Sequence, residues 1–563
     1  MPEIEMCKER VYSDEYQDYI IGRVGTFWSE ILEQDICRFP LDYSFQIIYA
    51  NQKEIGNREL YEIPYYSIPK PFSILDMQAL QETGISQIQQ IPGLELYGSD
   101  VLIGFLDTGI QYENELFRNL DGSTRILRIW DQTIEQGPLP SGLWYGTEYT
   151  EVEINDALAS ENPRLLVPST DENGHGTYIA SIACGSANPE NTFLGAAPEA
   201  DIVVVKLKQA KSYLREFYAI NEQTVCFQEN DIMAGLFYLR RIAAELNKPL
   251  VICMALGTSM GGHSGAMPLS SYMEVMGNIP LIALCAGTGN EADKRHHYLG
   301  RTQGEQMESI EINVGENVLG FFAEIWTEIP NIYSVSVESP SGEQSFQIPI
   351  REENEVYEFL FEDTTVYIQY RVLVESTNSE VIFLRFTNPI EGIWKINIYQ
   401  IGDGDGIFHI WLPVAEFLTG DVFFLQSNPD YTILAPANTQ AVSSVAYYNG
   451  ENGSLSASSG RGFTRTQRMK PDFAAPGIDV LGSNLRGQFV ERSGSSIGTA
   501  LTAGALAVLF EWLVKNGKTP DSIQLKNLII LGAEKESEII YPNQEWGYGK
   551  MNIYNTFLRI RDI

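Results

Sequence analysis

Short, continuous apolar runs alternate with stretches of helical spacing over residues 80–300 of the chain. The apolar runs span residues 101–106, 202–207 and 250–256, and apolar positions recur at helical spacing over residues 231–246. Runs of this length are typical of parallel strands that are buried on both faces of a sheet. We therefore predict an α/β core, in which a parallel sheet carries helices on both faces and which resumes near residue 431.

Two other parts of the chain have different patterns. Residues 333–337, 366–370 and 394–399 alternate between apolar and polar side chains, as half-buried strands do. They predict an inserted all-β sandwich of jelly-roll type over residues 305–430. A strand-like tract at 44–50 and a later proline-rich linker predict a small N-terminal α+β domain. The expected division is 1–75, 76–304, 305–430 and 431–563.

Charge and cysteine usage narrow the range of partners and compartments. The 38 basic and 74 acidic residues give a net charge of −36, which disfavours nucleic acid and anionic membrane surfaces as partners. The first residues show no secretory signal, and no apolar run approaches the roughly 18 residues that membrane insertion requires. The six cysteines are scattered, so we expect them to be reduced, buried and inert.

Three short segments, far apart in the chain, carry the residue types of nucleophilic catalysis. Asp107 ends an apolar run, His175 lies between two glycines, and Ser496 directly precedes a run of small apolar residues. A serine hydroxyl is a poor nucleophile unless a neighbouring base takes its proton, and that base needs a group that orients it. The three segments supply one candidate for each of these roles.

The segments occur in the order Asp, His, Ser, which is the order of the triad in subtilisins. With their flanks, they resemble the subtilisin-like serine peptidases, or subtilases, over residues 80–300 and 430–563. The resemblance implies that Ser496 is the nucleophile, His175 the general base and acid, and Asp107 the orienting carboxylate. It also implies a subtilisin-like fold for the α/β core.

Two further segments complete the resemblance. Residues 286–291 are similar to the subtilase segment whose asparagine stabilises the oxyanion, which implies that role for Asn290 beside the backbone N–H of Ser496. Ala255, Leu256 and Gly257 resemble the strand that lines the substrate cleft and pairs with the backbone of the peptide.

The segment after the serine departs from the pattern of the family. Common subtilases continue with methionine, alanine, threonine, proline and histidine, whereas this chain continues with Ile497, Gly498, Thr499, Ala500 and Leu501. Because the proline that usually fixes the start of the helix is absent, we expect a looser turn before this helix.

The intact triad, the lack of a secretory signal, the N-terminal domain and the inserted β-domain together resemble the clostridial Csp subtilases. This resemblance implies a serine endopeptidase that cleaves protein or peptide substrates through an acyl-enzyme, processes a precursor in spore germination, and is cytoplasmic or spore-associated. It implies a prodomain role for residues 1–75, with a simple accessory domain as the alternative. Some members have lost triad residues, so a catalytically silent regulator or sensor, its cleft blocked by the N-terminal domain, stays open.

No cofactor is expected from the sequence. His296 and His297 are adjacent, but consecutive side chains diverge on any regular element and no third ligand is evident, so we expect no metal site. A partner-binding role for residues 305–430 is a further alternative. The natural substrate, calcium binding and oligomeric state are left open by the sequence.

Overall fold

The computed structural model describes most of the chain. The described residues are 2–22, 28, 36–41, 44–74, 83–89, 94–303, 307–348, 354–374, 377–401 and 405–561. The expected boundaries at 75/76 and 304/305 lie outside these residues, so the predicted division of the chain stays a prediction at both points.

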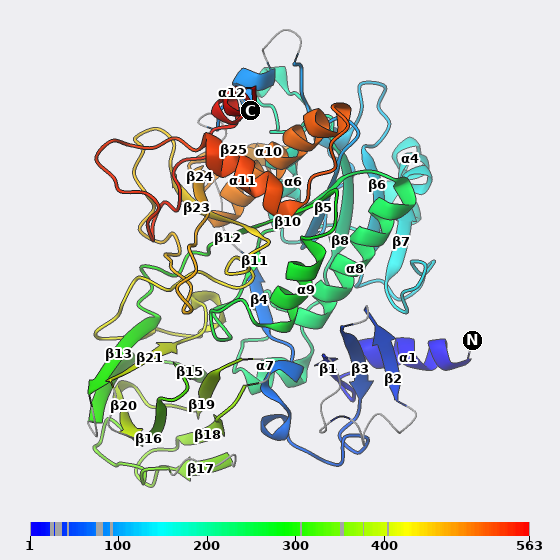
Figure 1. The fold of residues 1–563 in the computed structure, drawn as a ribbon. Coiled ribbons are helices and arrows are strands. Elements are labelled where there is room, and N and C mark those ends of the chain that lie inside the picture. The colour runs from blue at the N-terminus through cyan, green and yellow to red at the C-terminus, as the bar shows by residue number, and fades with distance from the viewer. Residues whose placement is uncertain are drawn as a thin grey trace.

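An eight-stranded sheet forms the centre of the molecule, with strand order β24-β23-β12-β10-β5-β8-β6-β7 (Figure 1). Neighbouring strands are parallel except for β6 and β7, which are antiparallel at one edge. The strands are β5 (Leu102–Asp107), β6 (Ile126–Asp131), β7 (Thr147–Thr150), β8 (Asp201–Lys206), β10 (Leu250–Met254), β12 (Ile282–Gly287), β23 (Ser443–Asn449) and β24 (Phe473–Ile478). The three apolar runs predicted to be buried strands are thereby confirmed.

Helices cover both faces of this sheet, as the alternation of side chains along β5 shows. Ile103 and Phe105 belong to one hydrophobic cluster, together with residues of α6 (His175–Cys184) and α10 (Ser495–Lys515). Leu102 and Leu106 point the other way, into a second cluster that contains residues of α8 (Glu229–Leu246) and α9 (Pro268–Met276). The predicted α/β core is confirmed, and so is the helix expected over residues 231–246.

Further helices complete the core. They are α3 (Ile85–Gln89), α4 (Glu151–Ala159), α5 (Pro163–Leu166), α7 (Ser212–Phe217), α11 (Ser522–Gly532) and α12 (Ile553–Arg561). A two-stranded hairpin of β25 (Val480–Ser483) and β26 (Phe489–Arg492) immediately precedes α10. This hairpin lies close to α6, because the phenol of Tyr178 in α6 donates a hydrogen bond to the carbonyl of Val490.

Helix α10 is the most apolar helix of the core. It is long and apolar enough to span a membrane by length and composition, with a mean hydropathy of 1.8, so the expectation that no segment reaches this length was wrong. Its side chains pack in one hydrophobic cluster with residues of the central sheet and of α6, and 89% of its most apolar 18-residue stretch is buried inside the protein. Its hydrophobicity is therefore accounted for by its place in the core.

The described residues between 297 and 424 form two antiparallel sheets that share one hydrophobic cluster. One sheet has the order β13-β21-β15-β19-β18-β17 and the other β16-β20-β14-β22. Their strands are β13 (His297–Gln303), β14 (Met307–Val314), β15 (Gly320–Glu328), β16 (Ile332–Glu338), β17 (Asn354–Glu358), β18 (Thr365–Arg371), β19 (Ser379–Thr387), β20 (Gly392–Ile401), β21 (Asp405–Trp411) and β22 (Val422–Phe424). The expected strands within 333–337, 366–370 and 394–399 are present.

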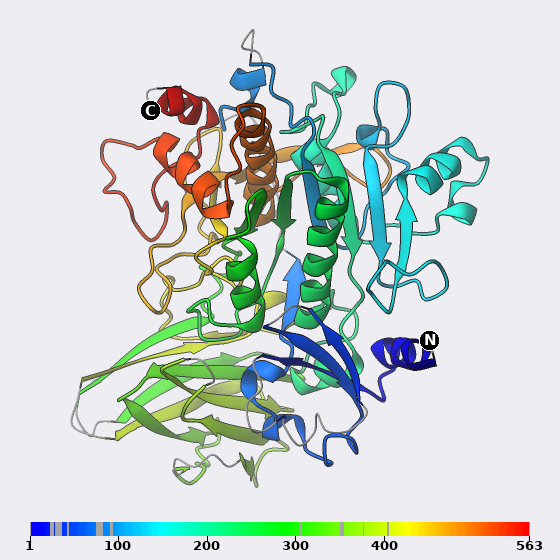
Figure 2. The same cartoon turned by 45° about the vertical axis from the view of Figure 1, so that its right-hand side comes forward.

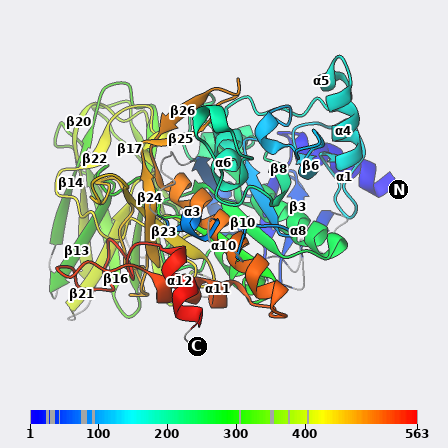
Figure 3. The ribbon, with the colours of Figure 1, turned by 90° about the horizontal axis from the view of Figure 1, so that it is seen from above.

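The N-terminal residues form α1 (Pro2–Tyr12) and a three-stranded antiparallel sheet, ordered β1-β3-β2. The strands are β1 (Gln17–Ile21), β2 (Cys37–Pro40) and β3 (Gln46–Ala50). Figure 2 shows this sheet directly below the lower ends of α8 and α9. The view from above in Figure 3 shows α1 at one side of the molecule and strands β13–β22 at the other.

A disulfide joins Cys7 of α1 to Cys37 of β2. The expectation that all six cysteines are reduced was wrong for this pair, because packing of α1 on the sheet brings together two cysteines that are 30 positions apart in the sequence. The remaining four cysteines are free and buried, as expected: Cys184, Cys226, Cys253 and Cys285.

The packing of α10 yields a stability prediction from two glycines of the same helix. A Cβ atom at Gly504 would lie 2.3 Å from the Cβ of Ala196 and 2.8 Å from the carbonyl oxygen of Ala183, whereas at Gly498 its nearest neighbour would be a methyl group of Val445 at 3.1 Å. Both changes to alanine gain about 1 kcal/mol of helix propensity. We expect overpacking, which costs about 1–3 kcal/mol, to give Gly504→Ala a lower melting temperature than Gly498→Ala in calorimetry.

Glu380 yields a prediction about pH. Its carboxylate is buried in β19 and accepts a hydrogen bond from the backbone N–H of Tyr333, and burial raises its pKa to about 8. The folded state therefore binds this proton more tightly than the unfolded chain does. The contribution of this proton to the free energy of unfolding is lost as pH rises from about 4.5 to 8. Relative to the parent, Glu380→Gln should gain about 1 kcal/mol or more between pH 5 and 8.

The exposed Glu391 supplies the control for this measurement. Thermal unfolding followed at several pH values should show no pH-dependent difference between Glu391→Gln and the parent. If Glu380→Gln also tracks the parent at every pH, the carboxyl group is ionised in the folded state and the argument from burial fails.

Candidate active site

Three side chains from three elements meet at one end of the central sheet. Asp107 is the last residue of β5, His175 is the first of α6 and Ser496 is the second of α10, and all three are buried. The Nδ1 atom of His175 lies 2.7 Å and 2.9 Å from the two carboxylate oxygens of Asp107. Its Nε2 atom lies 3.4 Å from the hydroxyl oxygen of Ser496.

These distances define the tautomer of His175. Both oxygens of an ionised carboxylate accept hydrogen bonds, so the nitrogen beside Asp107 has to carry a proton. In a neutral imidazole the other nitrogen, Nε2, is then an acceptor that faces the Ser496 hydroxyl. The backbone N–H of Thr108 also donates to Asp107, at 2.7 Å, and fixes the carboxylate further.

Glycine at position 176 permits the contact between α6 and β5. A Cβ atom at Gly176 would lie 2.2 Å from the carbonyl oxygen of Gly109 and 3.1 Å from the Cβ of Asp107. Any larger residue would push the first turn of α6 away from the end of β5. The sequence His-Gly therefore combines the imidazole with the small residue that allows it to reach Asp107.

Asn290 lies beside the start of α10, in the loop that follows β12. Its side-chain oxygen accepts a hydrogen bond from the backbone N–H of Ser495, at 3.1 Å. Because this contact uses the oxygen, the amide NH2 group is left to donate elsewhere. Gly289, at φ +91°, makes the turn that presents Asn290, and a side chain there would collide with Leu434.

The start of α10 is regular without proline. The helix begins at Ser495 and continues to Lys515, and the hydroxyl of Thr499 donates to the carbonyl of Ser495 at 2.9 Å. A looser start was expected from the missing proline, and the observed helix does not show it.

The cleft strand predicted at residues 255–257 pairs with a part of the N-terminal region. Leu256 and Gly257 form β11 (Leu256–Gly257), and Ala255 is buried directly before it. β11 pairs antiparallel with β4 (Pro71–Ile74), which on its other side pairs with β9 (Phe227–Gln228). β4 is therefore the central strand of a three-stranded sheet, in the place where the resemblance puts the peptide backbone.

Asp171 is a residue of the site that sequence reasoning missed. Its carboxylate accepts hydrogen bonds from the hydroxyls of Thr108 and Thr177, at 2.8 Å and 2.7 Å, and from the backbone N–H groups of Gly174 and Thr177. It thereby ties the residue after Asp107 to the first turn of α6, on both sides of His175. An aspartate placed shortly before a helix is the available sequence signal, because such residues cap helix N-termini.

The paired histidines lie apart from the triad in separate contacts. His296 pairs with Glu291 at 2.7 Å, and His297 lies 3.0 Å from a ring nitrogen of His409, with which it stacks. Burial lowers the pKa of His297 to about 3, which keeps that ring neutral. Within the described part of the chain, no three His, Cys, Asp or Glu side chains gather closely enough to hold a metal ion.

Comparison with known proteins agrees with this geometry. The model of the Subtilase family matches residues 98–313 and 418–549, which include Asp107, His175, Asn290 and Ser496. The structure of the Clostridium perfringens CspB protease is similar to this chain with a TM-score of 0.76 and 29% identity, covering 84% of this chain and 96% of that one. The chain therefore belongs to the Subtilase family of serine peptidases, and it resembles Csp.

Relatives known from their sequences are longer. The C5a peptidase of Streptococcus pyogenes is 32% identical over 471 residues, 75% of this chain and 35% of that protein. The subtilisin-like protease SBT3.12 of Arabidopsis thaliana is 28% identical over 213 residues, 35% of this chain and 26% of that protein. The chain thus spans about a third or less of the length of these relatives.

The position of Asp171 yields a prediction about catalysis. Asp171→Asn keeps the shape of the side chain but replaces one acceptor oxygen with a donor that faces N–H and O–H donors. We expect the first turn of α6 to shift, so that kcat falls by on the order of tenfold to a hundredfold while KM changes little. Steady-state hydrolysis of a peptide substrate measures both constants.

Glu172→Gln is the matched control, because the neighbouring Glu172 side chain is 76% exposed and pairs with Lys206. It should keep both constants close to those of the parent. Equal kcat values for Asp171→Asn and Glu172→Gln would show that Asp171 does not position His175.

Proposed function

We propose that this protein is a serine endopeptidase that uses Ser496, His175 and Asp107 as its catalytic triad. The observation that carries the proposal is the relay of contacts from Asp107 through His175 to Ser496, built from three separate elements. In this mechanism His175 takes the proton of the Ser496 hydroxyl as the oxygen attacks a peptide carbonyl. The imidazolium that forms is stabilised by Asp107.

The negative charge on the carbonyl oxygen requires donors. The NH2 group of Asn290 and the backbone N–H at Ser496 are proposed to supply them, and the N-terminal end of α10 favours the same charge. His175 then gives its proton to the leaving amine, and the C–N bond breaks to leave an acyl group on Ser496. Water, deprotonated by His175, attacks the acyl carbon and releases the product with a free Ser496 hydroxyl.

The substrate is proposed to bind as a strand beside Leu256 and Gly257, in the position that β4 occupies. The antiparallel pairing of β4 with β11 supports this proposal, because it shows that extended backbone fits there. Such pairing recognises the main chain of a protein or peptide and leaves specificity to the side-chain pockets.

Residues 1–75 are proposed to act as a prodomain whose last strand occupies the cleft. The remaining divisions, a catalytic domain over 76–304 and 431–563 and a jelly-roll sandwich over 305–430, are proposed as well. The paired sheets of residues 297–424 around one core support the sandwich. The similarity to the CspB protease supports a processing protease of spore germination, in a cytoplasmic or spore-associated setting.

A catalytically silent regulator is the second candidate function. The observation that favours it is the same strand β4, which fills the place of a substrate between β11 and β9. If β4 never leaves the cleft, an assembled triad has no access to protein substrates. A Ser496-dependent cut near the end of the N-terminal region, seen in the intact mass of the expressed protein, would exclude a purely silent role.

The test of the proposed function compares two adjacent serines. Ser496→Ala should lower kcat for peptide hydrolysis by on the order of 10⁶, because the nucleophile is lost. Ser495→Ala is the matched control, since Ser495 is equally buried, whereas the hydroxyl that lies 3.4 Å from Nε2 of His175 is that of Ser496. Unchanged hydrolysis by pure Ser496→Ala protein would refute the proposal.

A second test addresses the oxyanion. Asn290→Ala should lower kcat by about 10²–10³ with a smaller effect on KM, as is usual when one oxyanion donor is removed. If kcat is unchanged and KM rises instead, Asn290 acts in substrate binding.

A further inference from the structure

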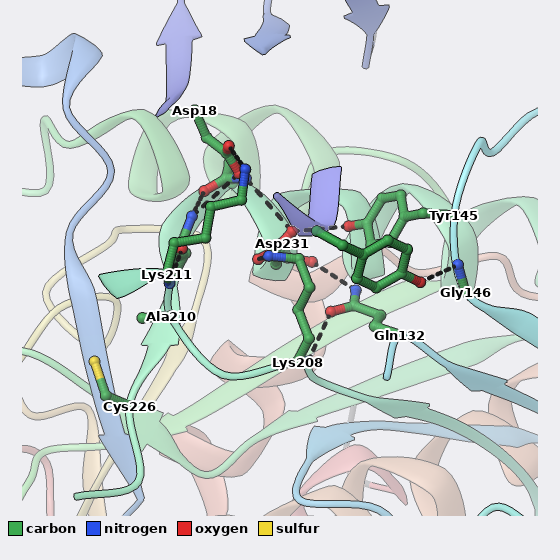
Figure 4. Close-up of polar contacts among 12 residues, drawn as sticks. Asp18, Gln132, Tyr145, Gly146, Lys208, Ala210, Lys211, Cys226 and Asp231 are labelled. Atoms are coloured by element: carbon green, nitrogen blue, oxygen red, sulfur yellow. Dashed lines mark hydrogen bonds and ion pairs between the residues drawn. The ribbon is translucent and has the colours of Figure 1, made fainter. Parts of the chain in front are cut away.

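Asp18 of β1 is a buried carboxylate whose partners all come from the catalytic core. Asp18 faces the ammonium group of Lys211 (Figure 4), and one carboxylate oxygen lies 2.5 Å from the ammonium nitrogen. The other accepts hydrogen bonds from the side-chain amides of Asn230, at 2.9 Å, and Gln228, at 3.2 Å. A charge removed from water in this way is tolerated only when it is paired and hydrogen-bonded, so the core supplies a site built for a carboxylate.

The N-terminal region in turn supplies the hydrogen-bond acceptors of Lys211, a residue of the core. Its ammonium group donates to the carboxylate of Asp18, to the carbonyl of Arg10 at 2.8 Å and to the carbonyl of Tyr16 at 2.9 Å. An ammonium group has three N–H donors, and each of these has an acceptor in residues 10–18. The buried cation of the core is thus satisfied by the N-terminal region, just as Asp18 is satisfied by the core.

The same core segment also holds the strand in the cleft. Gln228, which donates to Asp18, belongs to β9 and pairs with Pro71 of β4. The next residue, Glu229, accepts a hydrogen bond from the backbone N–H of Lys70, at 3.1 Å. Two consecutive core residues therefore fix both the folded N-terminal sheet and the strand that enters the cleft.

We propose that Lys211, Gln228 and Asn230 form a recognition site for the folded N-terminal region of this chain, in which Asp18 sets the register of β4 in the cleft. The occupant is the described part of the N-terminal region, which binds through the carboxylate of Asp18 and the carbonyls of Arg10 and Tyr16. This inference rests on the proposed function, since it concerns access to the same cleft.

Charge complementarity gives the site its specificity. A buried ammonium between two amide donors accepts a carboxylate and rejects a neutral or basic side chain, which would leave Lys211 without its anion. If β1 were shifted by one residue, Gln17 or Tyr19 would take the position of Asp18 and no carboxylate would face Lys211, so only one register satisfies the contact.

The experiment measures undocking of β4 in the full chain by amide hydrogen exchange of a peptide that contains residues 71–74. Asp18→Asn removes the anion and leaves the ammonium of Lys211 buried, so exchange in this peptide should be at least about tenfold faster than in the parent. Asp14→Asn is the matched control, because Asp14 makes an exposed contact with the backbone N–H of Ser212, at 3.0 Å. In Asp14→Asn, exchange of the peptide that contains residues 71–74 should match that of the parent.

Equal exchange of the β4 peptide in Asp18→Asn and in the parent would overturn the inference. If Asp18→Asn does not fold, Asn230→Ala removes one donor to Asp18 while it keeps the ion pair, and it should speed exchange by a smaller factor. Unchanged exchange in Asn230→Ala would then overturn the inference.

A separate readout tests the catalytic proposal in the same samples. A small fluorophosphonate should label Ser496 in the parent and in both variants, because the contacts of Asp18 described above involve no triad residue. Absence of labelling in every sample contradicts the proposed function, whereas the exchange comparison still decides the role of Asp18. The two failures are therefore distinguishable.

Discussion

The close approach of α6 to the end of β5 is the constraint on which the rest of the site depends. Gly176 leaves room for the carbonyl of Gly109, and Asp171 ties both segments together with hydrogen bonds. Only in this arrangement do the two oxygens of Asp107 reach Nδ1 of His175. The apolar helix α10 then needs to be held in the core at the right depth to bring Ser496 to the opposite nitrogen of the imidazole.

The small sheet β11-β4-β9 determines what fills the cleft. β11 and β9 present backbone groups that need partners, and β4 supplies them from the N-terminal region. An edge that binds extended backbone without reading its sequence suits a peptidase, but it also binds the protein's own chain. The buried contact between Asp18 and Lys211 adds the sequence-specific part, because it is charged, desolvated and made outside the cleft.

Much of the core could be predicted from sequence, because it depends on local patterns. Continuous apolar runs predicted β5, which ends at Asp107, and the buried strands β8 and β10, and the order of three short segments gave the candidate triad. The family model and the structural similarity confirm the family and the α/β fold. The roles of the individual residues stay predictions until the variants described above are measured.

The features that sequence could not supply are contacts between distant positions. The pairing of β4 with β9, the disulfide between Cys7 and Cys37, and the contact of Asp18 with Lys211 depend on tertiary packing and leave no periodic pattern. Short strands such as β9 and β11, with two residues each, lie below the length at which alternation can be recognised. The apolar length of α10 was underestimated because glycine, serine and threonine interrupt the run of apolar residues. The mean hydropathy of the stretch is nevertheless 1.8.

The protonation of His175 tests the central claim most directly. The chain has five histidines, so selective ¹⁵N labelling of histidine gives a spectrum that single variants can assign. The account predicts a strongly downfield proton bonded to Nδ1 of His175, held by Asp107, which disappears in His175→Gln and is displaced in Asp107→Asn. A His175 ring that carries its proton on Nε2 in the neutral protein would contradict the proposed mechanism, because that nitrogen could not then accept the proton of Ser496.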